Sequence, residues 1–365
     1  MSLATHELRR RPGRFAVATV VLTFLSLLLL LLGGLLDGLF LGSTGAIRAQ
    51  DADVIVYSDT ARDSFLRSRI TGDVRALVSE ADGVGDVGGL GFTLLGATVP
   101  GESELADVAV AGYELPPTGV PDVPADGHAW ADERLQESGV SIGDTLLVGP
   151  AATPVVVDGW VQDTNYLLQG GLWTTLDTWR AVQNANRPDA FVADDVVQVL
   201  VVRGDGSSTD LAAAIDAATG STSTLTVDEA VNALPGVKEQ KSTFDAIIYA
   251  TLAVVLAVVG LFFSLLTLER TGLYGVLKAI GASTRRLFAG VVLQAVVVAL
   301  IAFVAGGLLA LLAESALPGD IPLQLTVGRY VFTFVALIVA AVLGSAISLR
   351  RVTRIDPASA IGSAA

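Results

Sequence analysis

The sequence contains no cysteine, and its only methionine is the first residue. Disulfide bonds and thiolate chemistry are therefore excluded; an oxidising exterior permits disulfides without requiring them. The only histidines are His6 and His128, and no GxxxxGK[ST], HExxH or CxxC motif occurs. These motifs hold nucleotide phosphates or metal ions in several enzyme classes. Because none is present, we expect the chain not to be an enzyme and to hold no metal.

Charged residues are nearly absent from four long apolar runs. The run 15–41 is interrupted only by Asp37, and 246–268, 287–313 and 330–349 contain no charge. Each is long enough for a helix to cross ~30 Å of hydrocarbon, which takes about 20 residues. The first run also exceeds the apolar core of a signal peptide, which has about 7–15 residues. The sequence therefore predicts four transmembrane helices and no cleaved leader.

Basic residues are concentrated on one side of these runs and are sparse on the other, which predicts the orientation of the chain. The flanking basic residues are Arg9, Arg10, Arg11, Arg14, Arg270, Lys278, Arg285, Arg286, Arg350, Arg351 and Arg354. Arg329 is the only basic residue in the 314–329 loop. Since Lys and Arg near span ends favour the cytoplasm, we expect both termini and the 269–286 segment to be cytoplasmic. The protein is then a multi-pass protein of the cell membrane.

The large segment between the first two spans is acidic and has a mixed α/β pattern. Residues 43–243 contain 30 Asp and Glu against 11 Lys and Arg, a net charge of −19. So acidic a surface excludes nucleic acid as a partner. Strands are predicted at 53–58, 91–99, 106–115, 154–163 and 195–204, and helices at 59–70, 73–82, 176–183 and 209–219; residues 131–149 are predicted as a helix that runs into a strand. Two lobes that divide near the Pro-rich turn 115–127 are an open prediction.

The predicted fold class is a membrane α-helical protein with four transmembrane helices and a large extracytoplasmic α/β domain. The expected layout is an amphipathic cytoplasmic helix (1–14), spans at 15–42, 244–268, 287–313 and 330–349, an outer α+β domain (43–243), a cytoplasmic segment (269–286), an external loop (314–329) and a cytoplasmic tail (350–365).

Two stripes of small residues predict close helix packing. The stripe residues are Gly34, Gly38 and Gly42 in the first span, and Ala336, Ala340 and Gly344 in the fourth. Small residues at a spacing of four let two helix backbones approach closely, within one chain or across a homodimer axis. The alternative is that the two stripes only reflect the Ala- and Gly-rich composition of the chain. Asp37 is costly at membrane depth, so it either reaches the interface or lies on a substrate path.

Several motifs together resemble the MacB/FtsX-type ABC transporter permeases. They are ERTGLYGVLKAIGASTRRLF at 269–288, IDPASAI at 355–361, ERLQESGVSIGDTLLV at 133–148 and LWTTLDTWRAV at 172–182. The resemblance covers essentially the whole chain and implies a MacB-like periplasmic core domain. It departs from the family where Leu273 and Tyr274 precede Gly275 in place of the usual Glu-Ile-Gly, so Glu269 and Arg270 are left as the candidate contacts to the ATPase.

This resemblance implies a separate ABC ATPase partner that binds ATP and Mg²⁺, a second copy of the permease and contact with membrane lipid, with no cofactor held by this chain for catalysis. The implied coupling residues are Glu269, Arg270, Gly275, Lys278, Gly281, Arg285 and Arg286.

The stretch after the first span, residues 51–70, resembles the HrtB-like haem-exporter branch of this family. It implies export of haem, or of a similar flat amphiphile, with Asp37 and Tyr57 as candidate substrate contacts. Two alternatives stay open: export of a lipid, peptide, lipoprotein or drug, and an FtsX-like permease that transports nothing and activates an external cell-wall hydrolase.

Overall fold

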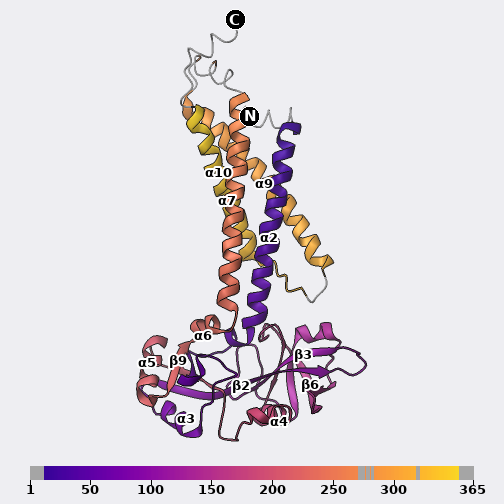
Figure 1. Ribbon diagram of the computed structural model, residues 1–365, viewed down its shortest axis with the longest axis vertical. Coiled ribbons are helices and arrows are strands. Elements are labelled where there is room, and N and C mark those ends of the chain that lie inside the picture. The colour runs from indigo at the N-terminus through magenta and orange to yellow at the C-terminus, as the bar shows by residue number, and fades with distance from the viewer. Residues whose placement is uncertain (1–11, 270–275, 277–279, 281–282, 318–320, 353–365) are drawn as a thin grey trace. The chain divides into compact units, whose positions relative to one another are not determined.

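The computed structural model describes residues 12–269, 276, 280, 283–317 and 321–352, and it divides into two units (Figure 1). The membrane unit comprises Met1–Gly38 and Lys241–Ala365, and the outer unit comprises Leu39–Gln240. The described membrane helices are α2 (Pro12–Arg48), α7 (Val237–Glu269), α9 (Thr284–Ala316) and α10 (Val327–Val352). All four are long and apolar enough to cross a membrane. The predicted fold class, four spans with an α/β domain, is confirmed.

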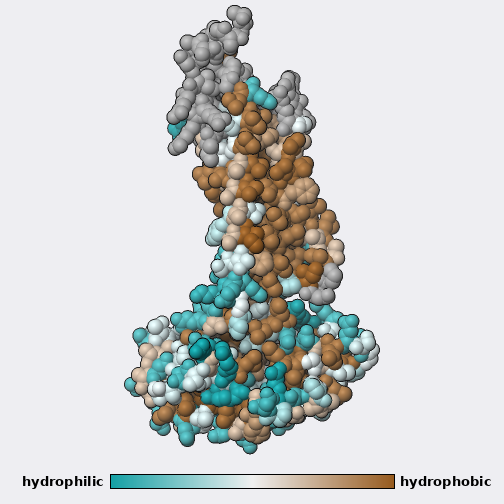
Figure 2. Space-filling view, in the orientation of Figure 1, coloured by the Kyte–Doolittle hydropathy of each residue, from teal (hydrophilic) through white to brown (hydrophobic). Residues whose placement is uncertain are grey.

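Heptad spacing of apolar residues explains how the membrane helices pack. Leu22, Leu29 and Leu36 of α2 are all buried, and so are Ile248 and Val255 of α7. A repeat of seven keeps one stripe of a helix against its neighbour. These side chains form a single core with residues of α9 and α10. Many other apolar residues of the four helices are exposed, and Figure 2 shows apolar residues covering the visible face of the membrane unit, as expected for a surface solvated by lipid.

Gly344, one of the small residues of α10, packs against α7 of the same chain. A Cβ atom added to Gly344 would lie 2.8 Å from Cγ1 of Val259 and 3.0 Å from the backbone nitrogen of Gly260. Ala340 is buried and Ala336 is half-buried on the same helix. This face of α10 is therefore occupied within one chain, and packing across a dimer axis stays a prediction.

Replacing Gly344 by leucine is expected to lower the free energy of unfolding by about 1–3 kcal/mol, because overpacking forces helices or side chains apart. Thermal unfolding of the detergent-solubilised full chain measures the effect. The matched control is Gly290→Leu, since a Cβ at Gly290 has nothing within 4 Å. Equal stabilities of the two variants would contradict close packing of α10 on α7.

The outer unit contains one nine-stranded sheet with short helices. The strands are β1 (Val54–Ser58), β2 (Val84–Thr98), β3 (Leu105–Tyr113), β4 (His128–Asp132), β5 (Thr145–Val148), β6 (Thr153–Val161), β7 (Gly170–Thr174), β8 (Val199–Gly204) and β9 (Thr222–Thr226). The α-helices are α3 (Gly72–Ser79), α4 (Leu176–Asn186), α5 (Ser208–Thr219) and α6 (Val227–Ala233), and the 3₁₀ helices are η1 (Asp59–Ala61), η2 (Glu133–Ser138) and η3 (Pro188–Ala190).

Strand β2 belongs to two parts of this sheet. The strand order is β3-β7-β4-β6-β5-β2-β8-β1-β9, and β2 also pairs with β3, so six strands close into a ring. One edge of β2 pairs with β8 at residues 84–90 and with β5 at residues 97–98. The other edge pairs with β3 from Leu90 to Thr98. The ring is therefore an insertion between β1 and β8, and the predicted lobe boundary at the Pro-rich turn 115–127 is wrong.

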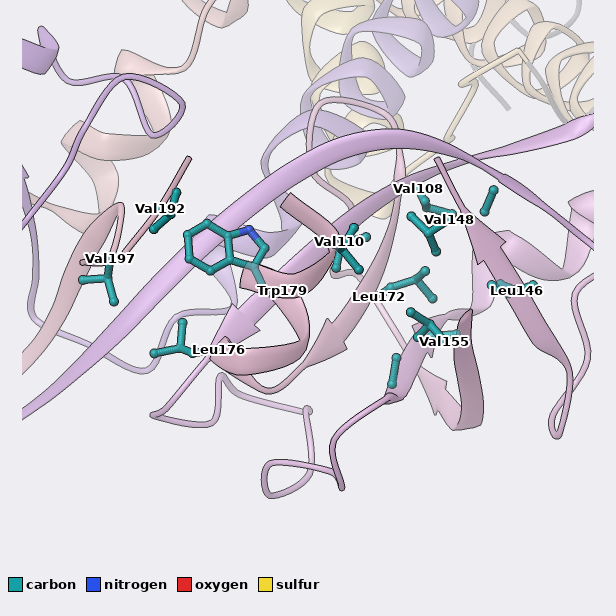
Figure 3. Close-up of a cluster of buried hydrophobic side chains, with 14 of the residues drawn as sticks. Val108, Val110, Leu146, Val148, Val155, Leu172, Leu176, Trp179, Val192 and Val197 are labelled. Carbon is teal, nitrogen blue, oxygen red and sulfur yellow. The ribbon is translucent and has the colours of Figure 1, made fainter. Parts of the chain in front are cut away.

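A glycine pair on neighbouring strands makes room for the largest side chain of the core. Gly91 of β2 lies opposite Gly112 of β3, and a Cβ on either residue would clash with Trp179 of α4. The indole is fully buried, and its Nε1 donates to Oγ1 of Thr93 over 2.9 Å. Figure 3 shows Trp179 among the valine and leucine side chains of this core.

Some predicted elements of the outer unit differ in the structure. Residues 59–70, predicted as a helix, form only the 3₁₀ turn η1 followed by turns and a bridge, and 132–139 forms η2 instead of an α-helix. Strands β4, β7 and β9 were not predicted, because β4 and β7 are each only 5 residues long with little alternation of polar side chains, and β9 is all Thr, Ser and Leu.

Candidate functional site

An ion pair lies at the end of the first span, next to the point where the chain enters the outer unit. Asp37 of α2 binds Arg329 of α10 through two hydrogen bonds: Nη2 donates to Oδ1 over 2.6 Å and Nε donates to Oδ2 over 3.2 Å. Oγ1 of Thr326 donates to Oδ2 of the same carboxylate over 2.8 Å. The side chain of Arg329 is 14% exposed and that of Asp37 21% exposed. Two parallel N–H···O bonds are the strongest form of this pairing.

Glycines of α2 create the space for this pair. The guanidinium arm of Arg329 lies against Gly33, where a Cβ atom would overlap it. The carbonyl of Gly34 accepts a hydrogen bond of 3.0 Å from the backbone N–H of Gln324, and Pro322 lies against Gly38. Gly34 and Gly38 of the α2 stripe are thus covered by the segment 322–325 of the same chain, whereas Gly42 lies against Leu168 and Arg134.

The last turns of α2 are held by a loop of the outer unit. The backbone N–H of Ala46 donates to the carbonyl of Asn165 over 2.9 Å. The N–H groups of Leu167 and Leu168 donate to the carbonyls of Ser43 and Gly42 over 3.1 and 2.9 Å. We call residues 163–168 the α2 clamp.

The α2 clamp is strained and is anchored by a buried carboxylate. Asp163, Leu167 and Leu168 have φ angles of 54°, 50° and 69°, a region unfavourable for residues other than glycine. Asp132 is 2% exposed and accepts from the N–H and Oγ1 of Thr164 over 2.8 and 2.7 Å. It also accepts from the backbone N–H of Arg134 over 3.0 Å. The carboxylate therefore holds a conformation that the loop sequence does not favour by itself.

Tyr57 lies in a cluster of aromatic rings beneath the end of α2. Its ring packs edge-to-face against Phe65 at 5.1 Å, and Phe92 stacks on Tyr166 at 4.3 Å. Tyr57 is fully buried, and its hydroxyl has no hydrogen-bond partner in the described part of the chain. Burial, with smaller contributions from Tyr166 and Asp63, raises the pKa of Tyr57 well above its ordinary value. In this arrangement Tyr57 offers no surface and no phenolate to a cargo molecule.

Two polar features of the outer unit contain parts of known site motifs. His128 Nδ1 lies 2.7 Å from Oδ1 of Asp158, but the described residues contain no group of three metal-ligating side chains. Gly139–Gly143 has the GxSxG spacing of a hydrolase nucleophile. That motif needs a strand–turn–helix context, whereas here Ser141 lies in an exposed turn between η2 and β5.

The chain has relatives along its whole length. Residues 246–357 match the family model for the FtsX-like permease C-terminal domain. The chain is 30% identical to an uncharacterized ABC transporter permease of Mycobacterium bovis, over 98% of each protein. The chain is an ABC transporter permease. More specifically, it is a permease of the MacB/FtsX type, as the sequence motifs predicted, and the predicted kind of protein is confirmed.

Other similarities of the permease are more distant. It is 22% identical over 240 residues to HrtB of Staphylococcus epidermidis, a protein named for hemin transport, and the alignment covers 66% of the permease and 65% of HrtB. Among solved structures, the periplasmic region of MacB from Actinobacillus actinomycetemcomitans aligns with a TM-score of 0.35 and 14% identity. That alignment covers 50% of the permease and 92% of the MacB region.

Membership of this family makes the permease a transporter membrane subunit that works with an ATPase. Of the predicted coupling residues, Glu269 ends α7 and Arg285 is an exposed residue of the first turn of α9. Arg286 lies in the same turn, and its side chain is outside the described part of the chain. Arg270, Gly275, Lys278 and Gly281 also lie outside the described residues. Contact of these residues with an ATPase therefore stays a prediction.

The sequence contained a signal for the ion pair but none for the α2 clamp. Asp37 is the only charged residue of its span and Arg329 the only basic residue of its loop, so two costly charges of opposite sign were available to pair. The α2 clamp has no comparable signal, because its strained residues are Asp and Leu rather than Gly.

Proposed function

We propose that this permease is the membrane subunit of an exporter that removes a hydrophobic amphiphile, with haem the leading candidate, from the membrane. We propose haem as the cargo because two thirds of the chain aligns with HrtB, a protein named for hemin transport. The chain has no phosphate-binding motif. ATP and Mg²⁺ are then bound and hydrolysed by a separate ATPase subunit, and the permease itself holds no cofactor.

The remaining parts of the proposal concern assembly. Two copies of the permease pair in the membrane, with lipid around them, because four spans supply only one half of an exporter. Both termini and the segment 269–286 face the cytoplasm, since the basic residues near the span ends are concentrated there. Glu269 and Arg285, which border this segment, then lie on the side of the ATPase.

Haem titration of the purified complex of permease and ATPase tests the cargo. The expected result is a saturable Soret shift near one haem per permease dimer, with a change in ATPase rate at the same haem concentrations. Controls are the ATPase alone and a complex whose ATPase cannot hydrolyse ATP; the second should still bind haem.

An unshifted Soret band with an unchanged ATPase rate would refute haem as the cargo. The second candidate function is that of a permease that transports nothing and activates an external cell-wall hydrolase. It is favoured because residues 246–357 match the FtsX-like domain. Co-purification of such a hydrolase with the complex would support it. Stimulation of the ATPase by a lipid, peptide, lipoprotein or drug would instead support export of that compound.

A further inference from the structure

The ion pair of Asp37 and Arg329 is adjacent to exposed apolar surface. Along the first turns of α10, Val327, Val331 and Phe332 are 80%, 56% and 43% exposed. The guanidinium carbon of Arg329 lies 5.7 Å from the centre of the Phe332 ring. A cationic group beside apolar surface matches a ligand that has a negative head and an apolar body, because each part meets a complementary surface.

The carboxylate of Asp37 shows which anion the guanidinium is shaped to hold. Arg329 presents Nε and Nη2 to the two oxygens of one carboxylate, in the forked geometry by which arginine binds carboxylate or phosphate oxygens in pairs. The net stability of such a partly buried pair is small, because loss of hydration offsets most of the attraction. When one carboxylate replaces another, the guanidinium stays paired, and the released Asp37 carboxylate, 21% exposed, keeps its hydrogen bond from Oγ1 of Thr326. Burial of an apolar ligand body on α10 adds stability to the exchanged state.

We propose that Arg329 binds the carboxylate of an amphiphile whose apolar body lies on Val327, Val331 and Phe332, and that Asp37 occupies the guanidinium when this ligand is absent. Asp37 is then an internal competitor rather than a direct ligand contact. Thr326 bonds both partners: its Oγ1 donates to Asp37 and accepts from the backbone N–H of Arg329 over 3.1 Å. The site rests on the proposed function only in treating such an amphiphile as the cargo.

The test uses spin-labelled octadecanoate and its methyl ester with the full complex in phosphatidylcholine nanodiscs. Asp37→Asn is expected to raise association of the carboxylate by about tenfold, the factor that corresponds to ~1.4 kcal/mol. Arg329→Gln is expected to lower it to the level of the ester, and Arg329→Lys to give an intermediate value because lysine lacks the planar fork. The measured quantity is the motionally restricted fraction of the electron paramagnetic resonance spectrum.

Glu314→Gln is the matched control, because it removes a negative charge that accepts from the backbone N–H of Leu325 and does not bond Arg329. It should leave association unchanged. A purely structural ion pair predicts that Asp37→Asn and Arg329→Gln weaken association alike. That result, or equal association of acid and ester in the wild type, would overturn the site.

A haem titration of the same variants separates this site from the proposed function. Carboxylate association with the expected pattern but no haem binding would retain the site and remove haem as the cargo. Haem binding that is unaffected by Asp37→Asn and Arg329→Gln, and equal for haem and its dimethyl ester, would retain haem and remove the site.

Discussion

Replacing Trp179 by alanine is expected to lower the free energy of unfolding of the outer unit by about 3–5 kcal/mol, the usual cost of deleting a buried tryptophan. The indole is fully buried over the Gly91–Gly112 pair of β2 and β3. Neither glycine has a side chain that can move into the cavity. The variant also removes the donor to Oγ1 of Thr93, which itself donates to Oε1 of Gln183 over 2.6 Å.

Chemical denaturation of the full chain, followed by hydrogen exchange of β2 and β3, measures this loss. Phe191→Ala is the matched control, because Phe191 is an aromatic residue of the same unit that is 66% exposed; its effect should stay within about 0.5 kcal/mol. If Trp179→Ala lowers the free energy of unfolding no more than the control does, the packing of Trp179 on the glycine pair does not stabilise the core.

Replacing Asp132 by alanine is expected to open the α2 clamp, at a cost of about 2–4 kcal/mol. The variant leaves the buried N–H groups of Thr164 and Arg134 without their acceptor. It also removes the acceptor of Thr164, the residue that follows the positive-φ residue Asp163, from a loop with two further positive φ angles. Amide hydrogen exchange of residues 164–168 in the full chain should therefore accelerate, while that of β8 should not change.

Asp144→Ala provides the control for Asp132→Ala. Asp144 also accepts a backbone hydrogen bond, from Ser141 over 2.8 Å, but that bond lies at an exposed position, so water can replace it. Unchanged exchange of residues 164–168 in Asp132→Ala would show that the clamp is held by its three bonds to α2 and not by the buried carboxylate.

The chain passes between its two units at two places. The outer unit is joined to the membrane unit only within α2, at Gly38–Leu39, and within α7, at Gln240–Lys241. Both helices continue through these points without a break. Residues 42–46 of α2 belong to the outer unit, and the α2 clamp bonds them there.

The sequence by itself determined the four spans, the acidic α/β domain and the permease motifs. A run of about 20 apolar residues is predicted to form a membrane helix, because backbone N–H and C=O groups in lipid have no water to bond and a helix pairs them within the segment. The strands with clear alternation, such as β3 and β6, were also predictable, since a period of two places one face in a core. The motif at 269–288 reflects local spacing and needs no fold to be recognised.

Only the tertiary structure decided which distant residues meet. It pairs Asp37 with Arg329 and places Gly91 opposite Gly112. It also pairs β2 with strands of both parts of the sheet. It also covers Gly34 and Gly38 of α2 with the segment 322–325, where the sequence allowed another helix or a second copy. The sequence did not predict these contacts because they join residues that are far apart in the chain, and the local sequence around a residue does not specify which distant residue it meets.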